Sequence, residues 1–218
     1  MRLLLIMALI LASSFSQAST IKLNYSIFYG YMKTMYKLDY QYVTTAFYLV
    51  NRDDKSLCKI NNAEIQVEDR RDPILFQPLG RLMPFYSDQH RKDGGVLVVD
   101  IDDSKTISSC DLQIKTMAKE RELAMLDAVK LMKISEQLEG VLKKNAGMIG
   151  QYFLPKFSGI RLQLSQPLNA QQVASLGHVI RVANNGELLI NNDSLDIVDK
   201  INELNLTVTR ITPWMVNE

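Results

Sequence analysis

Two cysteines, two histidines and a dense group of tyrosines are the side chains of this 218-residue chain that are best suited to chemistry. Cys58 and Cys110 lie 52 positions apart, and no third and fourth residue stands at a spacing typical of metal ligands. In an oxidising compartment the pair would form a disulfide, whereas in a reducing one it would stay as two buried thiols. A bridge here would stabilise the fold by about 4 kcal/mol, because it restricts the unfolded chain.

The tyrosines gather near the N-terminus, in a stretch with nine aromatic residues between positions 25 and 48. Tyr29, Tyr31, Tyr36 and Tyr40 form a candidate ligand platform, since a tyrosine that exposes its ring and hydroxyl can stack on a sugar, a peptide or a partner surface. The alternative, which we favour, is that the aromatic group fills the core between a helix and its sheet.

No arrangement of residues predicts a catalytic centre. His90 and His178 are the only histidines, and no serine lies in a Gly-x-Ser-x-Gly motif. Asp88 lies two positions before His90, but no nucleophile is indicated beside them. Glu64 and Glu68 could flank a glycosidic bond, but the sequence does not give their separation in space. We therefore predict no catalytic residues.

Two weak patterns could hold metals. Asp100, Asp102 and Asp103 follow an apolar run and offer oxygen atoms on nearby residues, as calcium requires, but the glycine turn and the distal glutamate of a calcium loop are missing. Met32 and Met35 could offer thioethers to copper, although methionines at helical spacing usually fill a core. We expect a solvated turn and core packing, with no metal site and no cofactor.

The first eighteen residues have the layout of a secretory signal peptide: Arg2, an apolar run over 3–12, then Ser16-Gln17-Ala18. We place the cleavage between Ala18 and Ser19. The apolar run is far shorter than the roughly twenty residues that span a bilayer. The sequence thus predicts an exported, soluble protein without a membrane span, and export favours the disulfide between the two cysteines.

Removing the signal peptide takes away Arg2 and leaves 24 basic and 24 acidic residues. A net charge of zero argues against a nucleic acid or another acidic polymer held by bulk electrostatics. We expect no nucleic-acid partner. An envelope protein and a glycan are the candidate partners.

Alternating and β-branched runs predict strands on both sides of one long helix. The helix lies within 120–150, where apolar residues recur every three or four positions. Asn184-Asn185-Gly186 predicts a hairpin, because both residue types tolerate positive φ. The predicted strands lie at 20–25, 40–50, 58–67, near 82, 96–99, 110–117, 160–164, 178–183, 187–190 and 206–214, with shorter helices at 26–35 and 194–204 and a loop over most of 73–95.

These elements predict an α+β fold, mainly antiparallel β, with two small β-rich, sandwich-like modules joined by one long amphipathic helix. The predicted boundaries are 1–18 for the signal peptide, 19–119 for an N-terminal β-rich module with the disulfide, 120–150 for the helix, and 151–218 for a C-terminal β-rich module.

Several short motifs carry a family resemblance: Cys58-Lys59-Ile60, Ser109-Cys110-Asp111-Leu112, the run from Gly147 to Pro155, and Ile211-Thr212-Pro213-Trp214. With the signal peptide, they make the chain resemble a gammaproteobacterial family of secreted proteins known only as a domain of unknown function. The resemblance implies a periplasmic location, a bridge between the two cysteines and no established activity. We predict a non-catalytic binding or structural module of the cell envelope, and keep an envelope hydrolase acting on a glycan or peptide as the alternative.

Overall fold

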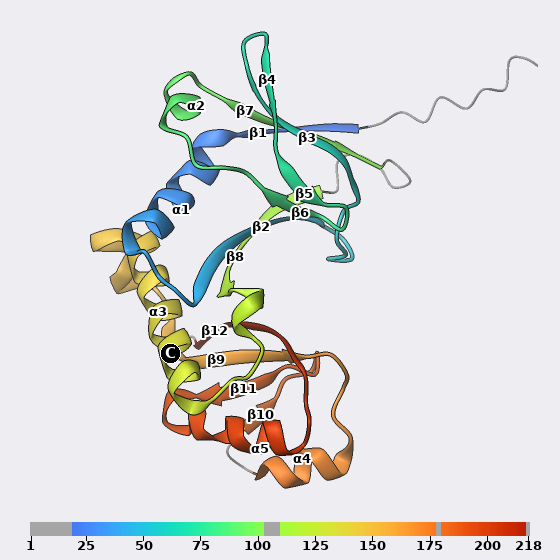
Figure 1. Cartoon of the computed structure of the whole chain (residues 1–218), viewed down its shortest axis with the longest axis vertical. Helices are drawn as coiled ribbons and strands as arrows, with labels where there is room; N and C mark the ends of the chain where they lie inside the picture. The colour runs from blue at the N-terminus through green and yellow to red at the C-terminus, as the bar shows by residue number, and fades with distance from the viewer. Residues whose placement is uncertain (1–18, 103–109, 178–179, 217–218) are drawn as a thin grey trace, which may run out of the picture.

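The computed structural model describes residues 19–102, 110–177 and 180–216, so the predicted signal peptide and Ala18 lie outside the described residues. The described residues form three antiparallel sheets of four strands each, with helices packed against them (Figure 1). This confirms the predicted α+β, mainly antiparallel class. Within the described part of the chain, no helix combines the length and the hydropathy needed to cross a membrane.

Two of the sheets are formed by the N-terminal half. The first has the order β1-β7-β3-β4, with β1 (Ser19–Asn24), β7 (Val96–Ile101), β3 (Ile60–Val67) and β4 (Arg70–Pro73). The second has the order β5-β6-β2-β8, with β5 (Leu75–Gln77), β6 (Arg81–Met83), β2 (Val43–Asn51) and β8 (Cys110–Ala118).

The third sheet is C-terminal and has the order β10-β11-β9-β12. Its strands are β10 (Ile180–Val182), β11 (Leu188–Asn191), β9 (Lys156–Leu164) and β12 (Val208–Val216). The helices are α1 (Tyr25–Leu38), α2 (Asp88–Lys92), α3 (Ala128–Gly150), α4 (Ala170–Leu176) and α5 (Val198–Glu203), with 3₁₀ turns at Glu120–Glu122, Gln151–Phe153 and Asn192–Ile197.

The two N-terminal sheets share one core with α1. The mostly apolar β7 lies between β1 and β3 in its sheet, and its residues Leu97, Val98, Val99 and Ile101 are buried. Phe28 of α1 is fully buried and packs against Phe47 of β2, with ring centroids 4.9 Å apart. Residues of β3, β6 and β7 complete this cluster. This arrangement accounts for much of the aromatic content between positions 25 and 48.

The long helix α3 connects the N-terminal sheets to the C-terminal one. Asp127 caps it by accepting the backbone N–H of Lys130, so the helix begins at Ala128 and not at the predicted residue 120. Its apolar stripe packs on the C-terminal sheet, together with two residues from β2 and β8. The buried residues of α3 are Leu131, Ile134, Ser135, Leu138 and Val141.

The sequence did not predict all of the short elements. The stretch after Pro73, expected to be a loop with one strand near Leu82, also contains β5 and α2, while β4 and α4 fall in stretches given no element. The predicted hairpin at Asn184-Asn185-Gly186 is confirmed, since β10 pairs with β11 and Gly186 has a φ of 80°. The division into modules at residues 119 and 150 stays a prediction.

Candidate functional site

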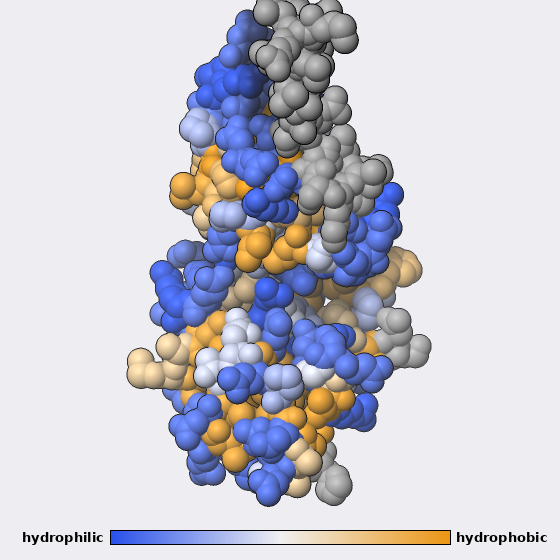
Figure 2. All heavy atoms as spheres, turned by 90° about the vertical axis from the view of Figure 1, so that its right-hand side faces the viewer, coloured by the Kyte–Doolittle hydropathy of each residue, from blue (hydrophilic) through white to orange (hydrophobic). Residues whose placement is uncertain are grey.

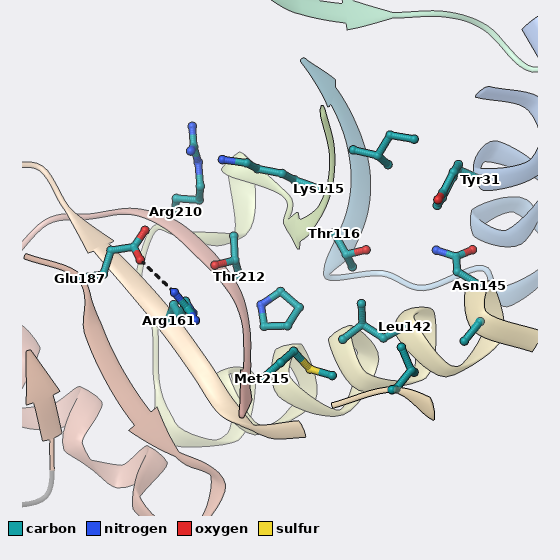
Figure 3. A pocket seen from close by; sticks show the side chains of 14 residues that line it. Tyr31, Lys115, Thr116, Leu142, Asn145, Arg161, Glu187, Arg210, Thr212 and Met215 are labelled. Carbon is teal, nitrogen blue, oxygen red and sulfur yellow. Dashed lines mark ion pairs between the residues drawn. The ribbon is translucent and has the colours of Figure 1, made fainter. Parts of the chain in front are cut away.

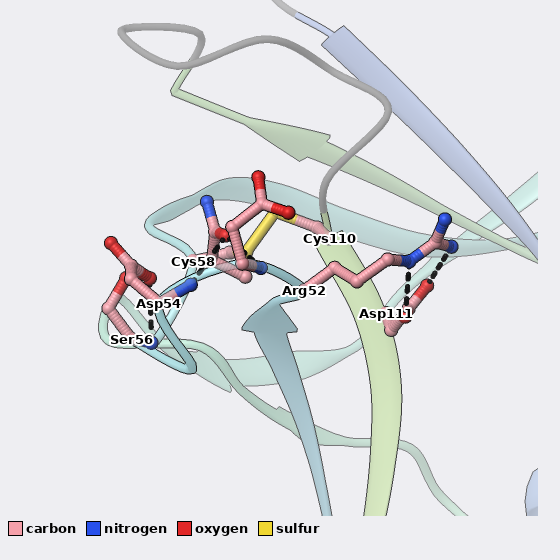
Figure 4. The surroundings of a disulfide bond; sticks show 8 residues. Arg52, Asp54, Ser56, Cys58, Cys110 and Asp111 are labelled. Atoms are coloured by element: carbon pink, nitrogen blue, oxygen red, sulfur yellow. Dashed lines mark hydrogen bonds and ion pairs between the residues drawn. A yellow bond between two sulfur atoms is a disulfide. The ribbon is translucent and has the colours of Figure 1, made fainter.

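The predicted disulfide is present and joins Cys58 to Cys110, with Cα atoms 6.4 Å apart (Figure 4). Cys58 lies just before β3, and Cys110 is the first residue of β8. Next to the bridge, Arg52 donates two hydrogen bonds to Asp111, at 2.9 and 2.7 Å. The bridge and this ion pair therefore anchor the beginning of β8, the strand that carries one wall of the cavity described below.

The four tyrosines of the candidate platform lie in different environments. Tyr29 is buried and stacks on Tyr86 with centroids 5.0 Å apart, whereas Tyr36 is 74% exposed and also stacks on Tyr86, at 5.4 Å. Tyr31 makes an edge contact with Phe47 at 6.3 Å, and Tyr40 packs closely against Gly140 of α3. A ligand platform stays a prediction, and Tyr36 is the member with the most exposed ring.

Hydrogen bonding explains the burial of Tyr29. Its hydroxyl donates to Asp88 and accepts from Tyr86. The bond to Asp88, followed by the contact with Tyr86, raises the pKa of Tyr29 above its ordinary value. This tyrosine is thus held in its neutral form as part of the packing between α1 and α2.

A cavity of about 600 Å³ lies between β8, the C-terminal end of α3 and the C-terminal sheet (Figure 3). In the space-filling view, hydrophilic and apolar residues lie side by side at mid-height, between the two halves of the molecule (Figure 2). The charged residues that line the cavity are Lys115, Arg161, Glu187 and Arg210. Three cations against one carboxylate give this region a positive charge, although the chain as a whole is nearly neutral.

Strand alternation places these side chains. On β12, Ile211 is buried in the core, so its neighbours Arg210 and Thr212 point to the opposite face. Arg161 of β9 lies directly opposite Thr212, which puts it on that same face. Lys115 projects from β8, and the two strands β8 and β12 lie side by side without pairing. Residues far apart in the sequence thus meet at one end of the cavity.

Lys115 and Arg210 form no ion pair in the part of the chain that the structure describes, because the nearby carboxylate of Glu187 pairs with Arg161. Each lies near the ring of Tyr48, at 6.0 Å for Lys115 Nζ and 5.6 Å for the guanidinium carbon of Arg210. In the described ranges neither makes a side-chain hydrogen bond or an ion pair, whereas Arg161 lies 3.7 Å from Glu187. Burial, and then the positive charge of Arg210, lower the pKa of Lys115, and the negative charge of Glu187 offsets part of this lowering. An anion placed between them would offset their mutual repulsion and favour the charged form of Lys115.

The rest of the lining is largely apolar. Leu142 and Ala146 of α3, Leu154, Pro213 and Met215 form the wall between the cationic end and an end with Tyr31 and Asn145. Figure 3 shows Arg210 and Lys115 at one end and Tyr31 with Asn145 at the other. The shape suits an elongated ligand that carries a negative charge at one end and an apolar body.

A second polar cluster surrounds His90, which belongs to α2 and is buried, and is not in the expected loop. His90 Nδ1 lies 2.8 Å from Ser87 Oγ, and His90 Nε2 lies 2.7 Å from Asp72 Oδ2. Arg70 donates to the same carboxylate at 2.9 Å. The hydrogen bond with His90, reinforced by the charge of Arg70, lowers the pKa of Asp72. We call these four residues the His90 cluster.

The His90 cluster has the residue types of a serine hydrolase triad, but Ser87 already has a structural role. Its Oγ caps α2 by accepting the backbone N–H of His90 at 3.2 Å. The ring of His90 packs between Tyr25 and Phe85, at centroid distances of 5.9 and 5.1 Å. The sequence did not indicate this cluster, because Asp72 and His90 belong to elements that were not predicted.

The remaining candidates from the sequence do not come together at one site. Glu64 pairs with Arg71 at 2.8 Å, Asp100 accepts from Thr20 at 2.8 Å, and Asp102 pairs with Lys59 at 2.7 Å. Met32 and Met35 line a separate cavity of about 280 Å³. His178 and Asp103 lie outside the described residues. Within the described ranges, no group of three histidine, cysteine or acidic side chains is arranged to hold a metal ion.

The cationic end of the cavity was also missed, although the sequence carries one signal for it. Residues 140–186 contain five lysines and arginines and no aspartate or glutamate. This acid-free stretch contributes Arg161 and three residues of the apolar wall, Leu142, Ala146 and Leu154. The other two cations come from β8 and β12, and only the fold brings them close.

Comparison with known proteins gives a family and no function. No curated protein and no solved structure matches the chain. A model of a protein family of unknown function, DUF2987, matches residues 17–164, which includes both cysteines, α3 and the whole of β9. The match ends before β12, so Arg210 and the Ile211-Thr212-Pro213-Trp214 motif lie beyond it. Because the matched segment is more than half of the chain, the protein belongs to the DUF2987 family of proteins of unknown function.

Proposed function

We propose that this protein is an exported, non-catalytic binding protein of the periplasm, and that its cavity holds an anionic ligand with an apolar body. The observation that carries the proposal is the pair Lys115 and Arg210, two partly buried cations at one end of a 600 Å³ cavity that form no ion pair among the described residues, since the nearby Glu187 pairs with Arg161. Burying charges without partners destabilises a fold, so such a pair is expected where a ligand supplies the missing charge.

The apolar wall narrows the ligand class. A small inorganic anion would leave most of the cavity unfilled, whereas an acidic group on an alkyl, aromatic or peptide body would also cover Leu142, Pro213 and Met215. Carboxylates and phosphates share the required chemistry. Both occur in envelope components, so the experiment has to compare the two head groups.

Short amphiphiles below their micelle concentration test the proposal. Octanoate and octyl phosphate are compared with acetate, inorganic phosphate and neutral octyl glucoside, by thermal shift and by equilibrium dialysis. We expect binding of at least one of the charged octyl compounds, with the head group alone and the neutral compound at least tenfold weaker. The preferred head group separates a carboxylate ligand from a phosphate ligand. The absence of binding by both charged octyl compounds would overturn the proposal.

Variants locate the binding to the cavity. Lys115→Gln combined with Arg210→Gln removes the two unpaired charges and is expected to weaken binding at least tenfold. Arg181→Gln is the matched control, because Arg181 is on the same sheet but lies over Trp214, at 5.9 Å, and does not line the cavity. Equal losses in the variant and the control would place the ligand elsewhere.

Export is part of the proposal and rests on the predicted signal peptide, with the disulfide as support. Expression of the full chain in a Gram-negative host should give a periplasmic form that begins at Ser19, as read by intact mass and N-terminal sequencing. The same mass should show no alkylation of Cys58 or Cys110 before reduction. A protein retained in the cytoplasm with residues 1–18 intact would contradict the export.

A hydrolase is the second candidate, and the His90 cluster is the observation that favours it. If Ser87 were a nucleophile, a fluorophosphonate probe would label the protein, and Ser87→Ala would abolish the labelling. Because Ser87 Oγ already caps α2, we expect no labelling. Specific labelling at Ser87 would show that Ser87 is a reactive nucleophile, and we would then favour the hydrolase over the binding protein.

A further inference from the structure

The C-terminal end of α3 exposes a compact group of large apolar side chains. Met148, Ile149, Tyr152 and Phe153 have exposed fractions of 81%, 73%, 80% and 82%. They lie within six consecutive positions, in the last turn of α3 and the following 3₁₀ turn. We call these four residues the apolar tip. Scattered exposed apolar residues are ordinary on a protein surface, but a contiguous group marks an interaction surface.

The break at Gly147 explains why the apolar tip is exposed. The apolar stripe of α3, which runs from Leu131 to Val141, faces the core. Gly147 then adopts φ 74° and ψ −178°, so the chain leaves the helical path and the residues after it no longer follow the stripe. The tip projects at the edge of the molecule, beside α1 (Figure 1).

The charged residues next to the apolar tip in the sequence are all basic. The tip lies inside the acid-free stretch 140–186. Lys144 and Lys156 flank it on either side and are exposed, while Lys143 is paired with Glu139 at 2.7 Å. An apolar protrusion flanked by free lysines is complementary to a surface that is anionic outside and apolar within.

We propose that the apolar tip inserts into the surface of an anionic lipid bilayer. Its side chains would enter the boundary between head groups and acyl chains, with the Tyr152 ring and hydroxyl at the interface and Lys144 and Lys156 on the lipid phosphates. A protruding tip matches a yielding lipid surface better than a flat protein surface. This docking is peripheral and does not depend on the ligand of the cavity.

Vesicle sedimentation tests this proposal with the exported form of the full chain. Vesicles of phosphatidylglycerol and phosphatidylethanolamine are compared with vesicles of pure phosphatidylcholine. We expect the protein to sediment with the anionic vesicles, to bind the neutral ones at least tenfold more weakly, and to dissociate when salt is raised.

Paired variants assign the binding to the tip. Ile149→Ser with Phe153→Ser is expected to weaken binding to anionic vesicles at least tenfold, and Lys144→Gln with Lys156→Gln at least threefold. Leu75→Ser with Met125→Ser is the matched control, since these side chains are 74% and 88% exposed but lie far from the tip in sequence. The control is expected to bind as the parent does.

Insertion itself has a direct readout. Phe153→Trp introduces an exposed tryptophan at the tip, whereas the native Trp214 is buried. Its fluorescence should be quenched by vesicles that contain brominated acyl chains. The proposal would be overturned if the parent failed to sediment with anionic vesicles, or if the Ile149→Ser and Phe153→Ser protein bound them as the parent does. It would also be overturned if the parent were a dimer and this variant a monomer, because the tip would then serve self-association.

Discussion

The cavity and the His90 cluster both gather charged side chains, but they treat them in opposite ways. In the His90 cluster each polar side chain has a neighbour: Asp72 is bonded to His90 and Arg70, and His90 also meets Ser87. In the cavity, among the described residues, Lys115 and Arg210 form no ion pair or side-chain hydrogen bond and lie near the ring of Tyr48, with the charge of Glu187 acting on Lys115 from a distance. A satisfied buried network stabilises a fold, whereas charges left open in a cavity are available to a ligand. We therefore predict that the His90 cluster contributes to the stability of the fold and that the cavity binds a ligand.

The disulfide gives the largest expected effect, and it lies outside both regions. Replacing Cys58 and Cys110 by alanine should lower the free energy of unfolding by about 4 kcal/mol, because the unfolded chain loses a closed loop. Urea denaturation measures the loss. Since the bridge anchors β8, which carries Lys115, ligand binding should weaken only modestly while the variant is folded. A variant as stable as the parent would contradict the structural role of the bridge.

The His90 cluster comes next. His90→Ala should cost about 2 kcal/mol, since it removes the imidazole that contacts both Asp72 and Ser87 and opens a space between Tyr25 and Phe85. Urea denaturation of this variant is compared with that of Arg210→Gln. If His90→Ala were as stable as the parent while Arg210→Gln unfolded at lower urea, the His90 cluster would not be the stabilising region of the two.

Acid should also act on the His90 cluster. The pKa of Asp72 is lowered in the folded protein, so its stabilising contribution is present above the ordinary aspartate value of about 3.9 and is lost as the pH falls below it. Urea midpoints at pH 3 to 6 should therefore fall less steeply with acid in Asp72→Asn than in the parent. Parallel curves for the two proteins would show that Asp72 makes no such contribution.

The cavity gives the smallest effect on stability. Lys115→Met removes a partly buried charge beside Arg210, so the free energy of unfolding should stay the same or rise by about 0.5 kcal/mol, a small value because water still screens the amine. The pKa of Lys115 is lower in the folded protein than in the unfolded chain. The parent should therefore gain stability as the pH rises from the folded-state pKa of Lys115 toward its unfolded-state pKa. This gain should be absent in Lys115→Met, as measured by urea midpoints between pH 8 and 10.5. A clear destabilisation at neutral pH would place Lys115 among the structural residues.

The sequence predicted local elements well and long-range arrangement poorly. Alternation identified β1 and β9, and a buried apolar run identified β7, because these patterns are local. It could not show that β1 pairs with β7, which brings Thr20 opposite Asp100 across 80 positions. The short α2 was missed because its packing, through His90, depends on tertiary contacts.

The candidate site shows the same limit. Lys115, Arg161 and Arg210 stand on three strands, and each alone looks like an ordinary surface residue in the sequence. The acid-free stretch was the available local signal, and it covers only Arg161. The density of tyrosines suggested a ligand platform. A dense aromatic segment does not by itself indicate exposure, because Tyr25, Phe28 and Phe47 of this segment are buried in the core.

The central claim, that the unpaired cations of the cavity bind a ligand, is tested most directly by isothermal calorimetry. The charged octyl compound that the parent prefers is titrated into the parent, Lys115→Gln, Arg210→Gln and the double variant. We predict one site per chain, a loss of affinity in each single variant, and a combined loss smaller than the product of the two, because both charges contact one anionic group. Equal affinity in the parent and the double variant would contradict the account.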